Sequence, residues 1–322
     1  MIRLCRALAS LKLTLVALVL FAAAVLYAYW STQPATPVLV APLALLAANL
    51  LASLATNPQL RRQTPLLVFH LSLLAIVLLA AAGRLTYLKG QLELAQGEEF
   101  SGTLSEVEAG PWHPMHLERL RFVNHGFDIA YAPGQKRQGT RNLLGYTDEA
   151  GIQRQVEVGD TTPLVLQGYR FYTSHNKGYA PTFFWHPANG ATPLLGAVHL
   201  PSYPANEYRQ AQEWTPPGSA AKIWMQLAFD ETIIDPEKPS EFRLPKQHTL
   251  VVRIGDARHE LQPGKSIELS GGKLVYAGLL TWMGYVVFYD WTIHWLLAAS
   301  IAAVLALGWH FWRKFAASPW DN

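Results

Sequence analysis

The stretch LLVFHLSLLAIVLLAAAG, residues 66–83, decides the fold of this chain. It carries no Asp, Glu, Lys or Arg, and Pro65 stands just before it, at the first turn of a helix, where proline is favoured. About 18 to 20 apolar residues are enough to cross the roughly 30 Å hydrocarbon core of a bilayer as a helix. The stretch therefore predicts a transmembrane helix.

Three further apolar runs have a similar length: residues 11–29, 38–55 and 293–312. The first has a basic flank, as a signal peptide does, but the bulky Tyr27-Ala-Tyr-Trp30 that ends it is not a small-residue cleavage site. We expect an uncleaved helix with an aromatic anchor there. The sequence thus predicts a membrane protein with four transmembrane α-helices, three in an N-terminal part of residues 1–84 and one in a C-terminal part of residues 292–322.

Residues 85–291 have an ordinary polar composition and are predicted to form a large all-β domain. Turn signals such as Ala132-Pro-Gly134 separate short stretches in which polar and apolar residues alternate, such as Phe127-Asp-Ile-Ala-Tyr131. Period-two stretches between closely spaced turns are typical of a β-sandwich or barrel-like domain. Residues 274–289 are apolar enough for a membrane segment, but two glycines and several β-formers favour a final buried strand.

The distribution of positive charge predicts the topology. Basic residues lie before the first helix, between the second and third, and after the fourth, whereas the loop at residues 31–36 has none. The positive-inside rule places both termini in the cytoplasm and the β-rich domain outside it. Arg84 and Lys89 follow the third helix on the outer side and count against the rule, but they precede a long exported domain, where the rule is weak.

The composition and the motifs exclude several functions. Half of the residues are hydrophobic and only 15% are charged. Cys5 is the only cysteine, so the chain has no internal disulfide, no Cys-x-x-Cys and no haem-attachment Cys-x-x-Cys-His. No basic stripe or nucleic-acid motif is present, and no catalytic constellation gives a positive case for an enzyme.

His70 is the most informative single residue, because it lies about 7–8 Å into the third apolar run. Ionisable residues inside a membrane are costly and are functional hypotheses by default, and neutral imidazole is a common axial ligand of haem iron. From the residues alone, a histidine satisfied by a neighbouring helix or reaching the membrane surface remains an open alternative.

Other histidines are weaker candidates. His294, beside Trp291 and Trp295, stands at the outer mouth of the fourth helix and suits either an interfacial haem site or an aromatic belt. His113 and His116 have a spacing that a metal could use, but Pro114 and the lack of nearby cysteine or carboxylate partners favour a loop.

The order of the elements resembles the ResB family, also called CcsB, of the System II pathway of cytochrome c biogenesis. No single piece is a strong signature, but their order is fairly specific. The similar pieces are Leu8–Leu15, Phe69–Leu73, Gly83–Thr86, Lys89-Gly90, Gly97-Glu98, Phe127–Tyr131 with Gly134, Pro163-Leu164, Gly168–Tyr172, Trp282–Tyr285 and Tyr289-Asp290.

The resemblance implies a subunit that works with a Trp-rich CcsA (ResC) partner in the bacterial inner membrane. The pair carries haem b across the lipid bilayer and presents it, reduced, for thioether attachment to apocytochrome c, so the chain is at most part of a haem lyase complex. His70 matches the histidine proposed in the family as a haem ligand within the membrane. The chain departs from the family in its short length and in lacking a cysteine near residues 52–55. A membrane-tethered β-domain that binds a protein and no cofactor is the alternative.

Overall fold

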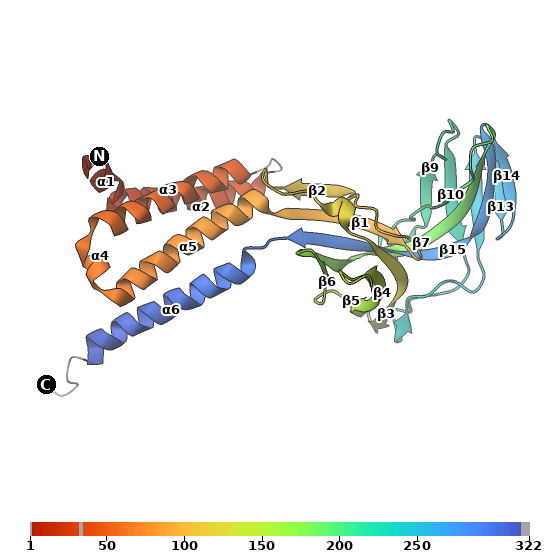
Figure 1. Ribbon diagram of the computed structural model, residues 1–322. Helices are drawn as coiled ribbons and strands as arrows, with labels where there is room; N and C mark the ends of the chain where they lie inside the picture. The colour runs from red at the N-terminus through yellow and green to blue at the C-terminus, as the bar shows by residue number, and fades with distance from the viewer. Residues whose placement is uncertain (1, 32–34, 317–322) are drawn as a thin grey trace. The chain divides into compact units, whose positions relative to one another are not determined.

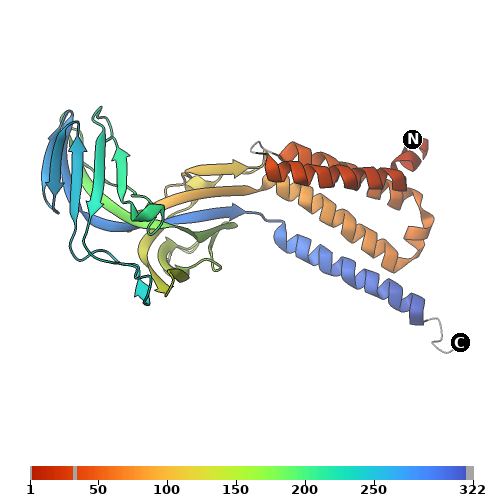
Figure 2. The same ribbon diagram turned by 180° about the vertical axis from the view of Figure 1, so that it is seen from behind.

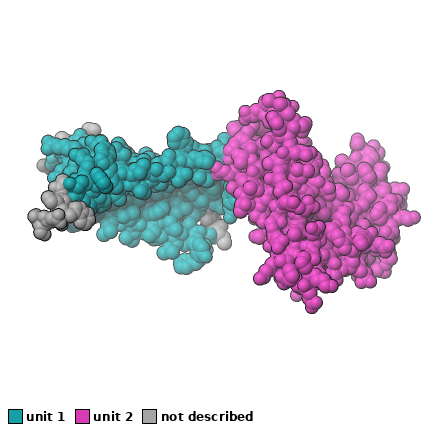
Figure 3. Space-filling view, turned by 90° about the horizontal axis from the view of Figure 1, so that it is seen from below, with its two compact units in different colours: residues 1–89, 107–114, 288–322 teal, residues 90–106, 115–287 magenta. Residues whose placement is uncertain are grey.

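The computed structural model describes residues 2–31 and 35–316 (Figure 1). Residues 32–34, which belong to the loop expected at 31–36, and the tail from residue 317 lie outside the described residues. The chain divides into two compact units, shown in different colours in Figure 3. Unit 1 comprises residues 1–89, 107–114 and 288–322, and unit 2 comprises residues 90–106 and 115–287.

The helices belong to unit 1. In chain order they are α1 (Ile2–Leu8), α2 (Leu11–Trp30), α3 (Thr36–Thr56), α4 (Pro58–Arg62), α5 (Thr64–Thr86) and α6 (Ile293–Ala316). Among the described residues, four of them, α2, α3, α5 and α6, are long and apolar enough to cross a membrane. The prediction of three such helices in the N-terminal part and one in the C-terminal part is confirmed.

Neighbouring helices of unit 1 pack in the order α2–α3–α5–α6. Ala47 and Leu54 of α3 form a small core with Leu74 of α5. Only 11% of the most apolar windows of α2 and α6 is buried, so most of their apolar side chains face outward, as expected for helices surrounded by lipid.

One polar side chain lies deep in this helix packing. Asn49 of α3 is 1% exposed. Its Nδ2 donates to the carbonyl oxygen of Leu8 at 2.6 Å, and its Oδ1 accepts from Thr14 Oγ1 at 2.8 Å. Both polar atoms of the amide are therefore paired, and they tie the junction between α1 and α2 to α3.

Between α3 and α5 the chain forms the short helix α4. The Asn57 side chain caps it by accepting from the Gln59 backbone N–H at 3.0 Å, and Arg61 and Arg62 form its last turn. Pro65 stands in the first turn of α5, as predicted. Two arginines are thus placed directly before the helix that carries His70.

The β-rich part of the chain contains strands and two single turns of 3₁₀-helix. The strands are β1 (Leu88–Ala95), β2 (Glu106–Ala109), β3 (Phe122–Ala132), β4 (Lys136–Thr147), β5 (Gln153–Val158), β6 (Leu164–Leu166), β7 (Tyr169–Pro187), β8 (Leu194–Ala197), β9 (Ala211–Trp214), β10 (Ile223–Ala228), β11 (Ser240–Glu241), β12 (Thr249–Ile254), β13 (Ala257–Leu261), β14 (Ser266–Leu269) and β15 (Gly272–Tyr289).

These strands form three sheets with antiparallel pairings. The largest has the order β2-β1-β15-β7-β6, with β14 also paired to β15 and β8 to β7. The other two have the orders β13-β12-β10-β9 and β11-β3-β4-β5, and Figure 2 shows the strands from behind. The predominantly β character is confirmed, and the ambiguous residues 274–289 lie in β15, a strand.

A buried polar network joins two of these sheets. Tyr285 Oη of β15 donates to Asn142 Oδ1 of β4 at 2.7 Å, and Asn142 Nδ2 donates to Asn124 Oδ1 of β3 at 2.8 Å. Asn124 Nδ2 in turn donates to the carbonyl oxygen of Leu94 at 3.0 Å. Asn124 and Asn142 are fully buried, so the amides specify how these strands meet instead of leaving unpaired polar atoms in the core.

Candidate functional site

His70 lies in the second turn of α5, and its side chain is half-buried within unit 1. The ring Nδ1 is 2.7 Å from the carbonyl oxygen of Leu66, one helical turn earlier. Side chains of a helix tilt toward its N-terminus, and this contact shows that the imidazole leans back along α5 toward its first turn.

The Leu66 contact determines which nitrogen of His70 carries the proton. A carbonyl oxygen accepts hydrogen bonds and donates none, so Nδ1 must be the protonated nitrogen. In the neutral ring, Nε2 then keeps its lone pair. A histidine whose Nδ1–H is held by a backbone carbonyl is the usual form of a metal-ligating imidazole, so the residue fits haem iron at Nε2.

The structure does not bring His294 to His70. His294 is the second residue of α6 and is exposed. The residues just before α6 contact the C-terminal end of α5, because a Cβ on Gly83 would meet Thr292 Oγ1. His70 is 13 residues before Gly83, roughly 20 Å along a helix. The two candidates therefore lie near opposite ends of the helix packing.

His113 and His116 are held in a loop by other contacts. His113 is 8% exposed, its Nδ1 is 2.7 Å from the Thr86 carbonyl oxygen, and its ring stands edge-on to Tyr289. His116 is exposed, with its Nδ1 3.9 Å from a Glu118 carboxylate oxygen. Among residues 2–31 and 35–316, no group of three or more His, Cys, Asp or Glu side chains is placed to hold a metal.

Sequence reasoning missed a polar cluster where α5 ends. The guanidinium of Arg84 pairs with Glu108 at 3.1 Å and lies 4.2 Å from the centre of the Tyr87 ring. Tyr87 Oη also donates to Glu108. Burial, followed by this hydrogen bond, raises the pKa of Tyr87 to about 12. Arg84, which opposes the positive-inside rule, is thus paired with a carboxylate, and only the fold could show which one.

At the other end of α5 and α6, basic side chains surround a cavity of about 550 Å³. The side chains around it come from the end of α4, the first turn of α5 and the last turns of α6: Arg62, Gln63, Pro65, Leu66, His310, Arg313 and Lys314. The sequence had presented these cations as topology markers alone, because nothing local connects residue 62 with residue 313.

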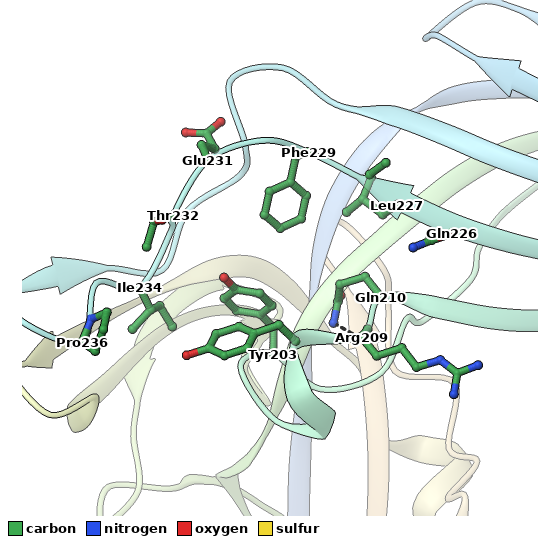
Figure 4. Close-up of a pocket in the computed structure, with 12 residues that line it drawn as sticks. Tyr203, Arg209, Gln210, Gln226, Leu227, Phe229, Glu231, Thr232, Ile234 and Pro236 are labelled. Carbon is green, nitrogen blue, oxygen red and sulfur yellow. Dashed lines mark hydrogen bonds between the residues drawn. The ribbon is translucent and has the colours of Figure 1, made fainter.

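Unit 2 contains an aromatic pocket of about 510 Å³, shown in Figure 4. Tyr203 and Phe229 line it with their ring centres 6.3 Å apart. Gln210 lies beside them and is 3% exposed, and its Nε2 donates to the carbonyl oxygens of Pro201 and Arg209 at 3.0 Å. No described residue donates to its buried Oε1.

Comparison with known proteins assigns the family. A model described as ResB-like family matches residues 53–314. The chain belongs to the ResB-like family. The match begins within α3 and ends within α6, so it includes His70, the basic cavity and the whole β-rich part. A search of curated proteins finds no match.

Membership of the ResB-like family confirms the resemblance found in the sequence and implies a role in cytochrome c biogenesis. Among the described residues, the four helices long and apolar enough to cross a membrane are consistent with such a role. Of the two histidine candidates named from the sequence, His70 combines a place inside a membrane helix with the tautomer that leaves Nε2 able to bind iron.

Proposed function

We propose that this chain is the ResB-type subunit of a haem delivery complex, with His70 as a haem ligand in the membrane. Together with a Trp-rich CcsA/ResC-type partner, it carries haem b across the bacterial inner membrane. The haem is cargo, passed on in the reduced state for thioether attachment to apocytochrome c. The chain acts as part of a haem lyase complex and is not a catalyst on its own.

The observation that carries this proposal is the Nδ1 contact of His70 with the Leu66 carbonyl oxygen at 2.7 Å. It holds the ring in one tautomer and one orientation before any ligand arrives, so little conformational entropy is lost on binding. The partner supplies the second axial histidine in this proposal. Apolar side chains of the membrane helices suit the macrocycle, which is flat and poorly soluble in water.

The orientation is part of the proposal. With the basic ends of the helices in the cytoplasm, both termini are cytoplasmic and the β-rich domain is periplasmic. Reporter fusions test this directly: a fusion near residue 200 is expected to be active only with a periplasmic reporter. Activity of a cytoplasmic reporter at that position would overturn the proposed haem route.

The decisive experiment measures haem in the purified complex. The chain is co-expressed with its CcsA/ResC-type partner, and haem b is quantified by the pyridine haemochrome method for wild type, His70→Ala and His186→Ala. His186 is an exposed histidine of β7 and controls for the loss of any imidazole. The proposal expects His70→Ala to lose most of the haem and His186→Ala to keep it.

A second candidate function is a membrane-tethered binding module without a cofactor. The aromatic pocket beside Tyr203 favours it, because the unsatisfied Gln210 Oε1 would accept a hydrogen bond from a bound N–H or O–H donor. This function predicts a colourless complex and an unchanged His70→Ala variant, so the same haem assay distinguishes the two candidates.

A further inference from the structure

The basic cavity at the start of α5 brings positive charges and apolar surface together. Membrane topology alone does not require the charges to gather there. Among the described residues, its lining includes Arg62, Arg313 and Lys314, all exposed, and no carboxylate. Within the described residues, no ion pair joins any of the three to an acidic side chain. Three cations from distant parts of the sequence thus converge on one space with no counter-charge among the described residues.

The positive-inside rule accounts for basic residues at these helix ends but not for their convergence. Arg313 and Lys314 also suit the C-terminal end of the α6 dipole. Neither effect requires Arg62, from the short helix α4, to border the same cavity. An anionic ligand held between α4 and α6 would account for it.

The cavity is lined by the turn of α5 that directly precedes His70. Leu66 lines the cavity, and its carbonyl oxygen holds the Nδ1–H of His70, four residues later. Residues i and i+4 of a helix lie one above the other. His70 is thus one helical turn further along α5 than Leu66, and Pro65 and Leu66 supply apolar surface beside the cations.

The chemical groups of haem are arranged in the same way as these side chains. The iron lies at the centre of a flat apolar macrocycle, and two carboxylates, the propionates, extend from one edge. A carboxylate immersed in hydrocarbon is costly, whereas one at the membrane boundary beside arginine forms charge-assisted, often bidentate, hydrogen bonds. A haem whose plane runs along α5 would hold its iron deeper in the membrane and its propionates at the basic end.

We propose that the cavity lined by Arg62, Arg313 and Lys314 binds the haem carboxylates while His70 Nε2 ligates the iron. This inference rests on the proposed function and adds the direction in which the haem is held. The basic end of the helices is then the end at which haem is loaded, and the carboxylates fix the orientation of the macrocycle before it moves on to the partner.

The test uses two ligands that share the iron and differ in the carboxylates. The full chain with its partner, in nanodiscs, is titrated with haem b and with haem dimethyl ester, whose propionates are uncharged. The variants are Arg62→Gln and the double variant Arg313→Gln/Lys314→Gln. Arg61→Gln is the matched control, because Arg61 is the neighbouring residue of α4, carries the same charge and does not line the cavity.

The expected result is a loss specific to the free carboxylates. Arg62→Gln and the double variant should each bind haem b roughly tenfold or more weakly than wild type, the loss expected for one or more charged hydrogen bonds. Arg61→Gln should bind as wild type does. All variants should bind the dimethyl ester equally, and the Soret band of bound haem should keep its position, because His70 still ligates the iron.

Three outcomes would overturn the inference. If haem b binds through His70 and the cavity variants match Arg61→Gln, the carboxylates lie elsewhere and only the proposed function stands. If the variants weaken the ester as much as the free acid, or only in nanodiscs of anionic lipid, the cations serve the fold or a lipid headgroup. If neither ligand binds in a manner dependent on His70, the inference and the proposed function fall together.

Discussion

Gly83 of α5 faces the hydroxyl of Thr292, and the contact leaves no room for a side chain at residue 83. A Cβ there would lie 2.7 Å from Thr292 Oγ1 and 3.5 Å from Asp290 Oδ1. Moving Thr292 away would cost free energy, because Thr292 is fully buried and both its backbone N–H and its hydroxyl donate to Asp290 Oδ1. The small residue thus sets how closely the start of α6 approaches α5, as small residues do in membrane helix packing.

We predict that Gly83→Ala lowers the thermal unfolding midpoint of the detergent-solubilised protein, with a cost of about 1–3 kcal/mol from overpacking. Gly308→Ala is the control, because a Cβ on Gly308 of α6 meets nothing within 4 Å. Alanine is also the better helix former, so the control should be neutral or slightly stabilising. Equal midpoints for the two variants would show that the contact with Thr292 is not tight.

The proposed role of His70 as a haem ligand predicts chemical rescue. His70→Gly leaves a gap in which free imidazole can bind, so haem content and the Soret band of the complex should be partly restored when imidazole is added at millimolar concentration. His294→Gly should lose much less haem than His70→Gly, because His294 lies at the other end of α6 from the basic cavity. A His70→Gly complex that keeps its haem without imidazole would contradict the assignment.

The buried network around Asn142 predicts a sharp difference between two tyrosine variants. Tyr285→Phe removes the donor to Asn142 Oδ1 and leaves that oxygen buried without a partner, which should cost about 1–3 kcal/mol. Tyr131→Phe is the matched variant: its hydroxyl is buried and pairs with no described residue, so its removal should be neutral or stabilising. Chemical denaturation followed by tryptophan fluorescence measures both; a similar loss in both variants would rule out the network as the cause.

Lys177 of β7 predicts how stability depends on pH. The side chain is 4% exposed and lies over the Tyr131 ring, near Arg137 and Asp160. Burial, and then repulsion from Arg137, lowers the pKa of Lys177 to about 8, while Asp160 opposes the shift. The unfolded chain therefore binds more protons than the folded one above about pH 8, so this residue makes stability rise with pH from there up to its unfolded pKa of about 10.4.

Lys177→Met should remove that dependence and raise stability most at neutral pH, where the buried charge is fully present in wild type. The measurement compares unfolding midpoints at pH 7.5 and 9.5. Higher pH is avoided because burial raises the pKa of Tyr203 and Tyr131 to about 12, so unfolding would then be favoured by ionisation of the unfolded tyrosines. A Lys177→Met variant that gains no stability would mean that the ammonium is solvated.

Local patterns in the sequence were sufficient to predict which segments form membrane helices and which form strands. The stretch around His70 predicts a membrane helix because its length and lack of charge are properties of neighbouring residues, and the alternation in Phe127–Tyr131 predicts a strand for the same reason. The final apolar stretch required a choice between strand and helix; its glycines and β-formers indicated a strand, and β15 is one. The order of these elements was also enough to indicate the ResB family.

What the sequence by itself determined was therefore the four apolar helices and the β-rich segment between them, and it named His70 as the candidate haem ligand. The tertiary structure alone decided that Gly83 meets Thr292 and that Arg62 borders the same cavity as Arg313. The physical reason is that helix length and alternation arise from residues close in the chain. A side-chain contact between residues some 200 or more positions apart depends on how packed elements approach each other, and no local pattern encodes that approach.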